Sequence, residues 1–424
     1  SLDYFLRGLA GEAYQDNAVF QELYSWYLQS PEYRILVKKL TEASFSERPS
    51  DKIGKTVAKI LYGEISPYSA TRLERFAACA FAHFLQYGLK VTERAEYEFR
   101  AMDMGNVMHM ALEKFAAEVR KEGLDWAELT EEERNRIIDS CLDQVSADYG
   151  NTILKSSARN EYMIERTRRI LRRTVWALQE QLKHGAFRPE GFEVRFQGGR
   201  IDRVDIMEEP ENNRVYVKVI DYKTGNTSFD LLALYHGLQL QLMVYLDGAL
   251  QVEKRKYPDR EIIPAGVFYY NVKDPMIQEK IHADMESINE QMLKKMKMNG
   301  LVQADDNMST KIDSTMASIP VSLNRDGSFS KRSSVASRKQ FDALGAYVRR
   351  KICDIRESIL DGNAAVEPYE LGKKNACTYC PYLTVCGFDR KIPGYEFHRL
   401  SSIEEDALWK KIMKGEEENG SEMD

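Results

Sequence analysis

Long apolar runs, cysteines and an excess of positive charge are all scarce or missing in this sequence. No run approaches the roughly 18 apolar residues of a membrane span, so we expect no transmembrane helix. Cysteine is scarce, with 6 in 424 residues, which excludes a secreted scaffold built on disulfides. Positive charge is not in excess, because the net charge is −6; this excludes a wholly basic surface but not a local basic groove. The start, Ser1-Leu2-Asp3-Tyr4, has neither an initiator methionine nor a leader, and we expect a fragment of a longer cytoplasmic protein.

The chain is long enough for two or three domain-sized cores, and its 43% hydrophobic and 30% charged residues are ordinary for a globular protein. We expect a helical lead-in over residues 1–60, the remnant of a preceding domain. A main domain is expected over 61–395, followed by a C-terminal helix and an acidic tail over 396–424.

Hydrophobic periodicity predicts strands between helices, which indicates an α/β fold. The predicted strands span 192–207, 215–223 and 262–272. The predicted helices begin at Ser69 and after Gly105, and continue over 131–185, 231–250, 276–297 and a long amphipathic stretch around 341–359. Residues 303–338 are predicted to form an exposed loop or irregular hairpin.

The most informative segment combines two acidic positions and a lysine. Side chains alternate along a strand, so Asp221 and Lys223 project from the same face. A hairpin can bring Asp202, on the preceding strand, beside them. Carboxylates hold Mg²⁺, which polarises a phosphoryl oxygen and acidifies a bound water, and a lysine stabilises the developing charge. The grouping therefore suits phosphodiester hydrolysis.

Two alternatives remain open at this point. An Asp-x-Lys triplet alone is also typical of an exposed ion pair on a surface hairpin. Asp205 competes with Asp202 as the second carboxylate, but it faces the other way in a regular strand, so we expect Asp202 to be the ligand and Asp205 to be structural.

Four segments together resemble the ordered motifs of RecB-family nucleases in the PD-(D/E)xK superfamily. They are Gly105-Asn-Val-Met-His109, Gly199-Arg-Ile-Asp-Arg-Val-Asp205, Val219-Ile-Asp-Tyr-Lys-Thr-Gly225 and Gln241-Leu-Met-Val-Tyr245.

The resemblance implies a restriction-endonuclease-like core, a mixed central sheet flanked by helices, with extra helical segments. It implies that His109, Asp202 and Asp221 bind Mg²⁺ or Mn²⁺ and that Lys223 is catalytic. Gln241 and Tyr245 would support the site or touch DNA. Taken alone, His109 is more typical of an ordinary histidine on a mostly apolar helix than of a metal ligand.

The cysteines cluster near one end as Cys377-Thr-Tyr-Cys380-Pro-Tyr-Leu-Thr-Val-Cys386. Three thiolates so close need one distant partner to complete a four-ligand set, and Cys79 is the best candidate. This spacing resembles the iron–sulfur site of AddB-type nucleases, which implies a [4Fe-4S] cluster that closes the domain over 61–395. Zinc is the alternative occupant. The sequence departs from the family at Ala80, where proline usually follows the first cysteine.

The AddB-type resemblance covers about residues 61–395 and implies a Mg²⁺- or Mn²⁺-dependent DNA exonuclease. It would cut single-stranded DNA beside an AddA-type helicase–nuclease subunit, in double-strand break repair and recombination. The alternatives are a standalone Cas4-like nuclease and a non-catalytic DNA-binding or assembly module. A basic stretch at 166–173 is compatible with tracking a DNA backbone, but also with an ordinary solvated face.

Overall fold

The computed structural model describes residues 2, 5, 8, 18–44, 52–63, 69–93, 101–149, 157–277, 284–305, 307–392 and 394–420. The chain divides into two compact units. The first comprises Ser1–Asp51 and Asp389–Tyr395, and the second comprises Lys52–Phe388 and Glu396–Asp424.

The described part of the first unit includes the helices α2 (Ala18–Gln29) and α3 (Arg34–Ser44). Its small core is aromatic, because Phe5, Phe20 and Tyr27 are all buried there. The rings of Phe5 and Tyr27 lie 5.3 Å apart, a spacing typical of favourable aromatic pairs.

The second unit contains a mixed six-stranded sheet in the order β1-β2-β3-β4-β5-β6. The β3–β4 and β5–β6 pairs are parallel and the others are antiparallel, which confirms the predicted mixed sheet. The strands are β1 (Arg188–Phe196), β2 (Gly199–Glu209), β3 (Arg214–Lys223), β4 (Glu261–Asn271), β5 (Asn299–Gln303) and β6 (Val335–Ala336).

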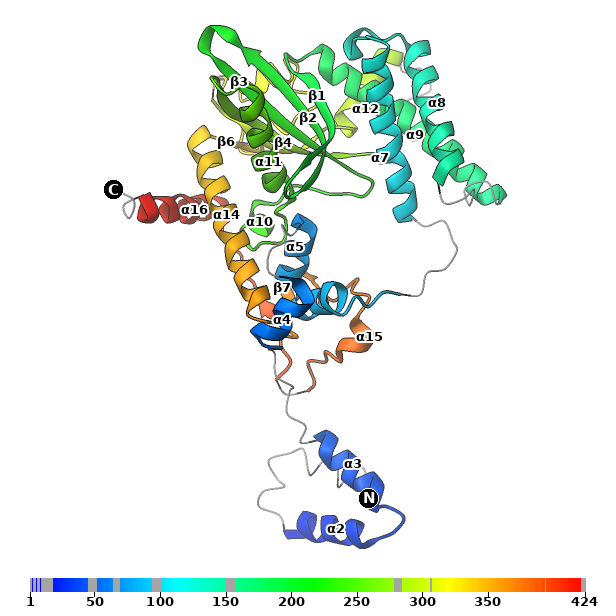
Figure 1. The fold of residues 1–424 in the computed structure, drawn as a ribbon, viewed down its shortest axis with the longest axis vertical. Coiled ribbons are helices and arrows are strands. Elements are labelled where there is room, and N and C mark those ends of the chain that lie inside the picture. Colours follow the sequence, from blue (N-terminus) through cyan, green and yellow to red (C-terminus); the bar gives the residue numbers. More distant parts are fainter. Residues whose placement is uncertain are drawn as a thin grey trace. The chain divides into compact units, whose positions relative to one another are not determined.

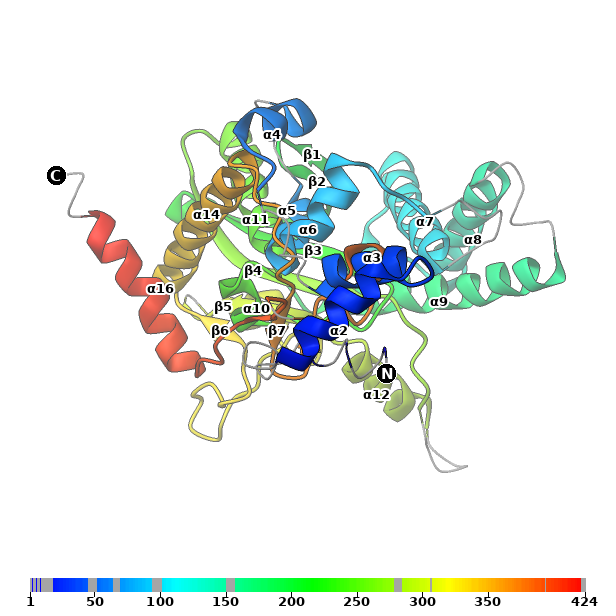
Figure 2. The same cartoon turned by 90° about the horizontal axis from the view of Figure 1, so that it is seen from below.

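Helices cover both faces of this sheet (Figures 1 and 2). Side chains alternate along β3, so Tyr216 and Ile220 pack into one core while Val217 and Val219 pack into the other. The first core is closed by α7 (Ala101–Lys121), α8 (Glu131–Asp148), α9 (Ala158–Lys183), α12 (Met285–Lys295) and α13 (Met308–Ile312). The second is closed by α4 (Lys55–Tyr62), α5 (Ala70–Ala78), α10 (Leu231–Tyr235), α11 (Gln241–Lys256), α14 (Arg338–Leu360) and α16 (Glu405–Gly420).

Short elements complete the second unit. A small sheet has the order β8-β7-β9. The remaining elements are α6 (Ala80–His83), the π-helical η2 (Phe84–Gly88), the 3₁₀ turns η3 (Trp126–Glu128) and η5 (Pro210–Asn212), α15 (Leu383–Cys386), β7 (Tyr369–Leu371), β8 (Lys374–Asn375) and β9 (His398–Arg399).

Three predicted elements each correspond to two elements in the structure. The strand predicted over 192–207 is two strands, β1 and β2, because the chain turns at Gln197 and Gly198. The helix predicted over 231–250 is α10 and α11, separated by Gly237 in the left-handed region (φ 80°), where glycine is favoured. The helix predicted over 131–185 is α8 and α9, with 150–156 outside the described residues.

The helix predicted over 276–297 is shorter, because α12 spans Met285–Lys295 and the described residues 272–277 are not helical. The loop predicted over 303–338 is irregular for most of its length but contains α13 and β6.

Three other predictions agree with the structure. The strand predicted over 262–272 is β4, and the long amphipathic helix is α14, which begins with a capping box between Ser337 and Gln340. The predicted start at Ser69 is confirmed, because its hydroxyl accepts from the Arg72 N–H at the start of α5. Within the described part of the chain, no helix has both the length and the apolar character to span a bilayer.

Candidate active site

Three neighbouring strands place acidic side chains side by side. Arg203 on β2 pairs with Ile220 on β3, so the next step of the same register sets Asp202 opposite Asp221. On the other side of β2, the pairing of Val194 with Ile201 sets Glu193 of β1 opposite Asp202. Directly opposed residues share one face of a sheet. Glu193, Asp202 and Asp221 therefore form a row across β1, β2 and β3.

Helix α7 brings His109 to this row. The Nδ1 atom of His109 lies 3.4 Å from Oδ2 of Asp202, and the same oxygen accepts the backbone N–H of Tyr222 at 2.8 Å. Gly105 lies one turn earlier on α7, where a Cβ would stand 3.3 Å from Oγ1 of Thr224. The absence of a side chain at Gly105 thus lets α7 approach the end of β3 closely.

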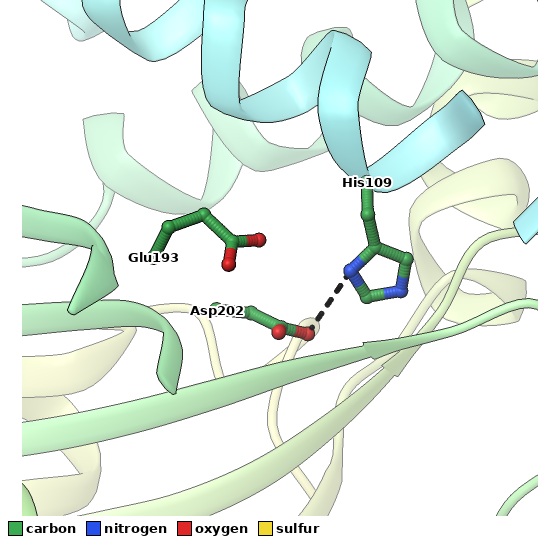
Figure 3. Close-up of side chains that lie close together, drawn as sticks. All are labelled: His109, Glu193 and Asp202. Atoms are coloured by element: carbon green, nitrogen blue, oxygen red, sulfur yellow. Dashed lines mark ion pairs between the residues drawn. The ribbon is translucent and has the colours of Figure 1, made fainter. Parts of the chain in front are cut away.

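His109, Glu193 and Asp202 form a candidate metal site (Figure 3). One ligand atom from each lies within 4.8 Å of the others. Glu193 has a left-handed backbone (φ 50°), unusual for a side chain with a Cβ, and also pairs with Arg200. Carboxylate oxygens with one imidazole nitrogen suit Mg²⁺ and Mn²⁺.

Asp221 is held by a second network that includes the predicted lysine. Lys223 Nζ lies 2.6 Å from Asp221 Oδ2 and donates to Gln241 Oε1 at 2.7 Å. The Gln241 amide nitrogen donates to Asp221 Oδ1 at 3.1 Å and to the Tyr245 hydroxyl at 2.9 Å. The structure therefore places Asp221, Lys223, Gln241 and Tyr245 in one hydrogen-bonded group.

The site is electrostatically prepared for a cation. Burial raises the pKa of Asp202 and of Asp221, and the proximity of the two carboxylates raises that of Asp221 further. Burial, followed by the charge of Asp202, raises the pKa of Glu193 to about 7. Burial lowers the pKa of His109, which keeps its imidazole neutral and able to ligate. A divalent cation would relieve the repulsion among these acids.

Glu193 was not predicted to belong to the site. The predicted strand over 192–207 ran through the turn and hid the β1–β2 hairpin. The signal in the sequence was the glycine-rich turn Gln197-Gly198-Gly199. The hairpin that this turn forms places Glu193 opposite Asp202.

Asp205 faces the opposite side of β2, as predicted, and is fully buried. Its carboxylate accepts from Nε and Nη2 of Arg203 at 2.6 and 2.9 Å, and lies 3.0 Å from Nζ of Lys218. The Arg203 guanidinium also lies over the Trp126 ring, 5.4 Å from its centroid. Asp205 thus belongs to a buried ion-pair cluster away from the acidic row.

The four cysteines of the predicted set line one small cavity, together with apolar side chains including Phe81 and Val366. Burial raises the pKa of Cys79 and raises that of Cys377 to about 11, and the nearby thiols add to both shifts. The Phe388 N–H donates to the Cys386 sulfur at 3.5 Å. Four sulfur donors facing one cavity fit a thiolate-bound metal or cluster.

Four arginines of the predicted basic stretch form ion pairs within the protein. Arg168 and Arg172 pair with Asp139, and Arg169 and Arg173 pair with Asp274. These ion pairs connect α9 to α8 and to the segment after β4, and the four arginines line one open cavity together with Arg134.

Comparisons with known proteins show which proteins this chain is similar to. The family model of the PD-(D/E)XK nuclease superfamily matches residues 67–387. An ATP-dependent helicase/deoxyribonuclease subunit of Lachnoclostridium phytofermentans is 39% identical over 98% of this chain and 38% of its own length. The protein of the same name from Alkaliphilus metalliredigens is 35% identical over 93% of this chain and 36% of its own. The chain thus spans little more than a third of the length of these relatives.

Proposed function

The chain belongs to the PD-(D/E)XK nuclease superfamily, and on this premise we propose that it is a metal-dependent deoxyribonuclease that hydrolyses phosphodiester bonds of single-stranded DNA as an exonuclease. The observation that carries the proposal is the convergence of His109, Glu193 and Asp202 beside the Asp221–Lys223 pair. Its relatives are named as helicase/deoxyribonuclease subunits. We therefore propose an AddA-type helicase–nuclease subunit as partner and double-strand break repair and recombination as the setting.

Each residue of the site has a proposed role. His109, Asp202 and Asp221 are the proposed ligands of Mg²⁺ or Mn²⁺, and Glu193 is a further ligand. The bound ion would polarise the phosphoryl oxygen and lower the pKa of a water. Lys223, held at 2.6 Å from Asp221, would stabilise the negative charge that develops on the phosphate.

Gln241 would keep this lysine and this aspartate in place, since its amide contacts both. Tyr245 would orient the amide in turn, through its hydroxyl. Both residues lie on one side of α11, one turn apart.

We also propose that Cys79, Cys377, Cys380 and Cys386 hold a [4Fe-4S] cluster. The support for this proposal is that all four cysteines line one small cavity, which fits the four thiolate ligands of such a cluster. Zinc is the alternative occupant. Iron, sulfide and zinc analysis of purified protein, with an absorption spectrum, tests the assignment.

The nuclease proposal is tested by cleavage of end-labelled single-stranded and duplex DNA in Mg²⁺, in Mn²⁺ and with a chelator. We expect metal-dependent cleavage that Asp221→Asn abolishes. Asp247→Asn is the matched control, because it makes the same chemical change on α11. Asp247 pairs with Arg349, outside the site. Tight DNA binding without cleavage in either metal would favour the non-catalytic DNA-binding module instead.

A further inference from the structure

The start of helix α11 is held by an acid from a distant part of the chain. The residue before the helix, Leu240, supplies no side-chain cap. Instead Oε1 of Glu74, on α5, accepts the backbone N–H groups of Leu240 at 2.6 Å and of Gln241 at 2.9 Å. The first N–H groups of a helix have no partner within the helix and carry partial positive charge, so a carboxylate is well suited to them.

The held residue is central to the proposed site. The side chain of Gln241 accepts from Lys223 and donates to Asp221 and Tyr245. Its amide reaches all three from the first turn of α11. Glu74 fixes that turn through the backbone of the same residue. A shift of this turn would therefore displace the lysine and the aspartate together.

Glu74 is a buried acid that does not belong to the candidate metal site. Burial raises its pKa to about 7, although the two N–H groups and the charge of Lys223 lower it. It is not among the three residues whose ligand atoms converge at the candidate metal site. Burying this carboxylate costs free energy, which its two hydrogen bonds to backbone N–H groups offset only in part. We therefore expect the geometry that it maintains to serve the function of the protein.

We propose that Glu74 is a positioning residue of the active site, which holds the start of α11 so that Gln241 keeps Lys223 and Asp221 in register. This inference rests on the proposed nuclease function. Glu74 lies five residues before Cys79 on the same helical segment. The segment that carries the first cysteine thus also holds the catalytic helix.

The first test measures the position of the helix without relying on activity. Hydrogen–deuterium exchange of peptides covering 238–248 should be at least about tenfold faster in Glu74→Ala than in the wild type, because two N–H groups lose their acceptor. Glu74→Gln retains an oxygen acceptor of nearly the same size and should remain close to the wild type. Unchanged exchange in Glu74→Ala would overturn the proposal.

The second test measures cleavage below the melting temperature. Glu74→Ala should lower kcat about tenfold or more, with the KM for DNA and the Kd for Mn²⁺ changed less than about threefold. If Glu74 acts through Gln241, the double variant Glu74→Ala/Gln241→Ala should have a kcat within about twofold of Gln241→Ala alone. Losses that multiply would show independent action and overturn the proposal.

A cap of another helix provides the control for a purely structural effect. Asp230 accepts the N–H groups of Leu232 and Ala233 at the start of α10, without contacting the catalytic group. Asp230→Ala should lower stability while leaving kcat within about twofold. An equal loss of kcat in both variants would overturn the positioning role. If the wild type cuts DNA in neither metal, the nuclease function fails, and the exchange experiment still decides whether Glu74 holds α11.

Discussion

Asp202 and Asp205 lie three residues apart on one strand, yet the structure predicts opposite consequences for their removal. Asp205 is buried between two cations, Arg203 and Lys218. Asp202 faces the metal site, where burial opposes its charge. We predict that Asp205→Asn loses stability and that Asp202→Asn loses cleavage. The two substitutions are matched, because each converts a carboxylate into an uncharged amide of nearly the same size.

The cost of Asp205→Asn follows from what it leaves behind. Arg203 and Lys218 are 1% and 4% exposed, so two cations would remain buried without their anion. Removing one partner of a buried ion pair costs about 3–5 kcal/mol. With an unfolding entropy of about 2.1 cal/mol/K per residue, this corresponds to a fall of about 4–6 °C in the melting temperature of the larger unit.

The charge of one of the two cations can be relieved. Burial lowers the pKa of Lys218, and Asp205 is the main group that raises it. Without Asp205, Lys218 should release its proton as the pH rises, whereas Arg203 keeps its charge. The destabilisation should therefore be larger at pH 6 than at pH 9.

Asp202→Asn should change the free energy of unfolding by less than about 1 kcal/mol without metal, since the amide oxygen can still accept the Tyr222 N–H. Cleavage should fall at least about 100-fold. Urea unfolding at several pH values and cleavage assays well below the midpoint measure both effects. The reasoning is refuted if Asp205→Asn is as stable as the wild type, or if Asp202→Asn is the less stable of the two.

Three further predictions concern the sites separately. Because the pKa of Glu193 is raised to about 7, the folded state binds a proton there that the unfolded state releases above about pH 4.5. Without metal, Glu193→Gln should thus gain stability over the wild type as the pH rises from about 4.5 to 7. It should also bind Mn²⁺ more weakly by calorimetry. A difference in unfolding free energy that does not change with pH would contradict the assignment. Lys223→Met should lower kcat about 100-fold or more while Mn²⁺ affinity changes less than about threefold, and a parallel loss of both would make the lysine part of the metal site. Cys79→Ser should lower iron content and stability, the latter by up to about 5–6 kcal/mol, because the cluster would otherwise close a loop of nearly 300 residues; an unaltered urea midpoint would show that the cysteines do not crosslink the fold.

Much of the site was predictable because strands obey a simple alternation. Asp221 and Lys223 share a face, and the antiparallel pairing of β2 with β3 brings Asp202 beside them. The same rule separated Asp202 from Asp205. Glu193 was not predicted because a continuous strand was expected through Gln197 and Gly198. The register of a hairpin can be assigned only after its turn has been recognised.

The helices were harder to predict, for a physical reason. Residues 231–250 have continuous helical periodicity, yet the chain bends at Gly237 and starts a new helix at Gln241. The N–H groups exposed by that break would be costly without a partner, and the side chain of Leu240, the residue before the helix, makes no capping hydrogen bond. The partner is Glu74, 166 residues earlier. A helix boundary stabilised by such a distant acceptor leaves no local signal, so the residue that sets the position of Gln241 becomes visible only once the two segments are seen together.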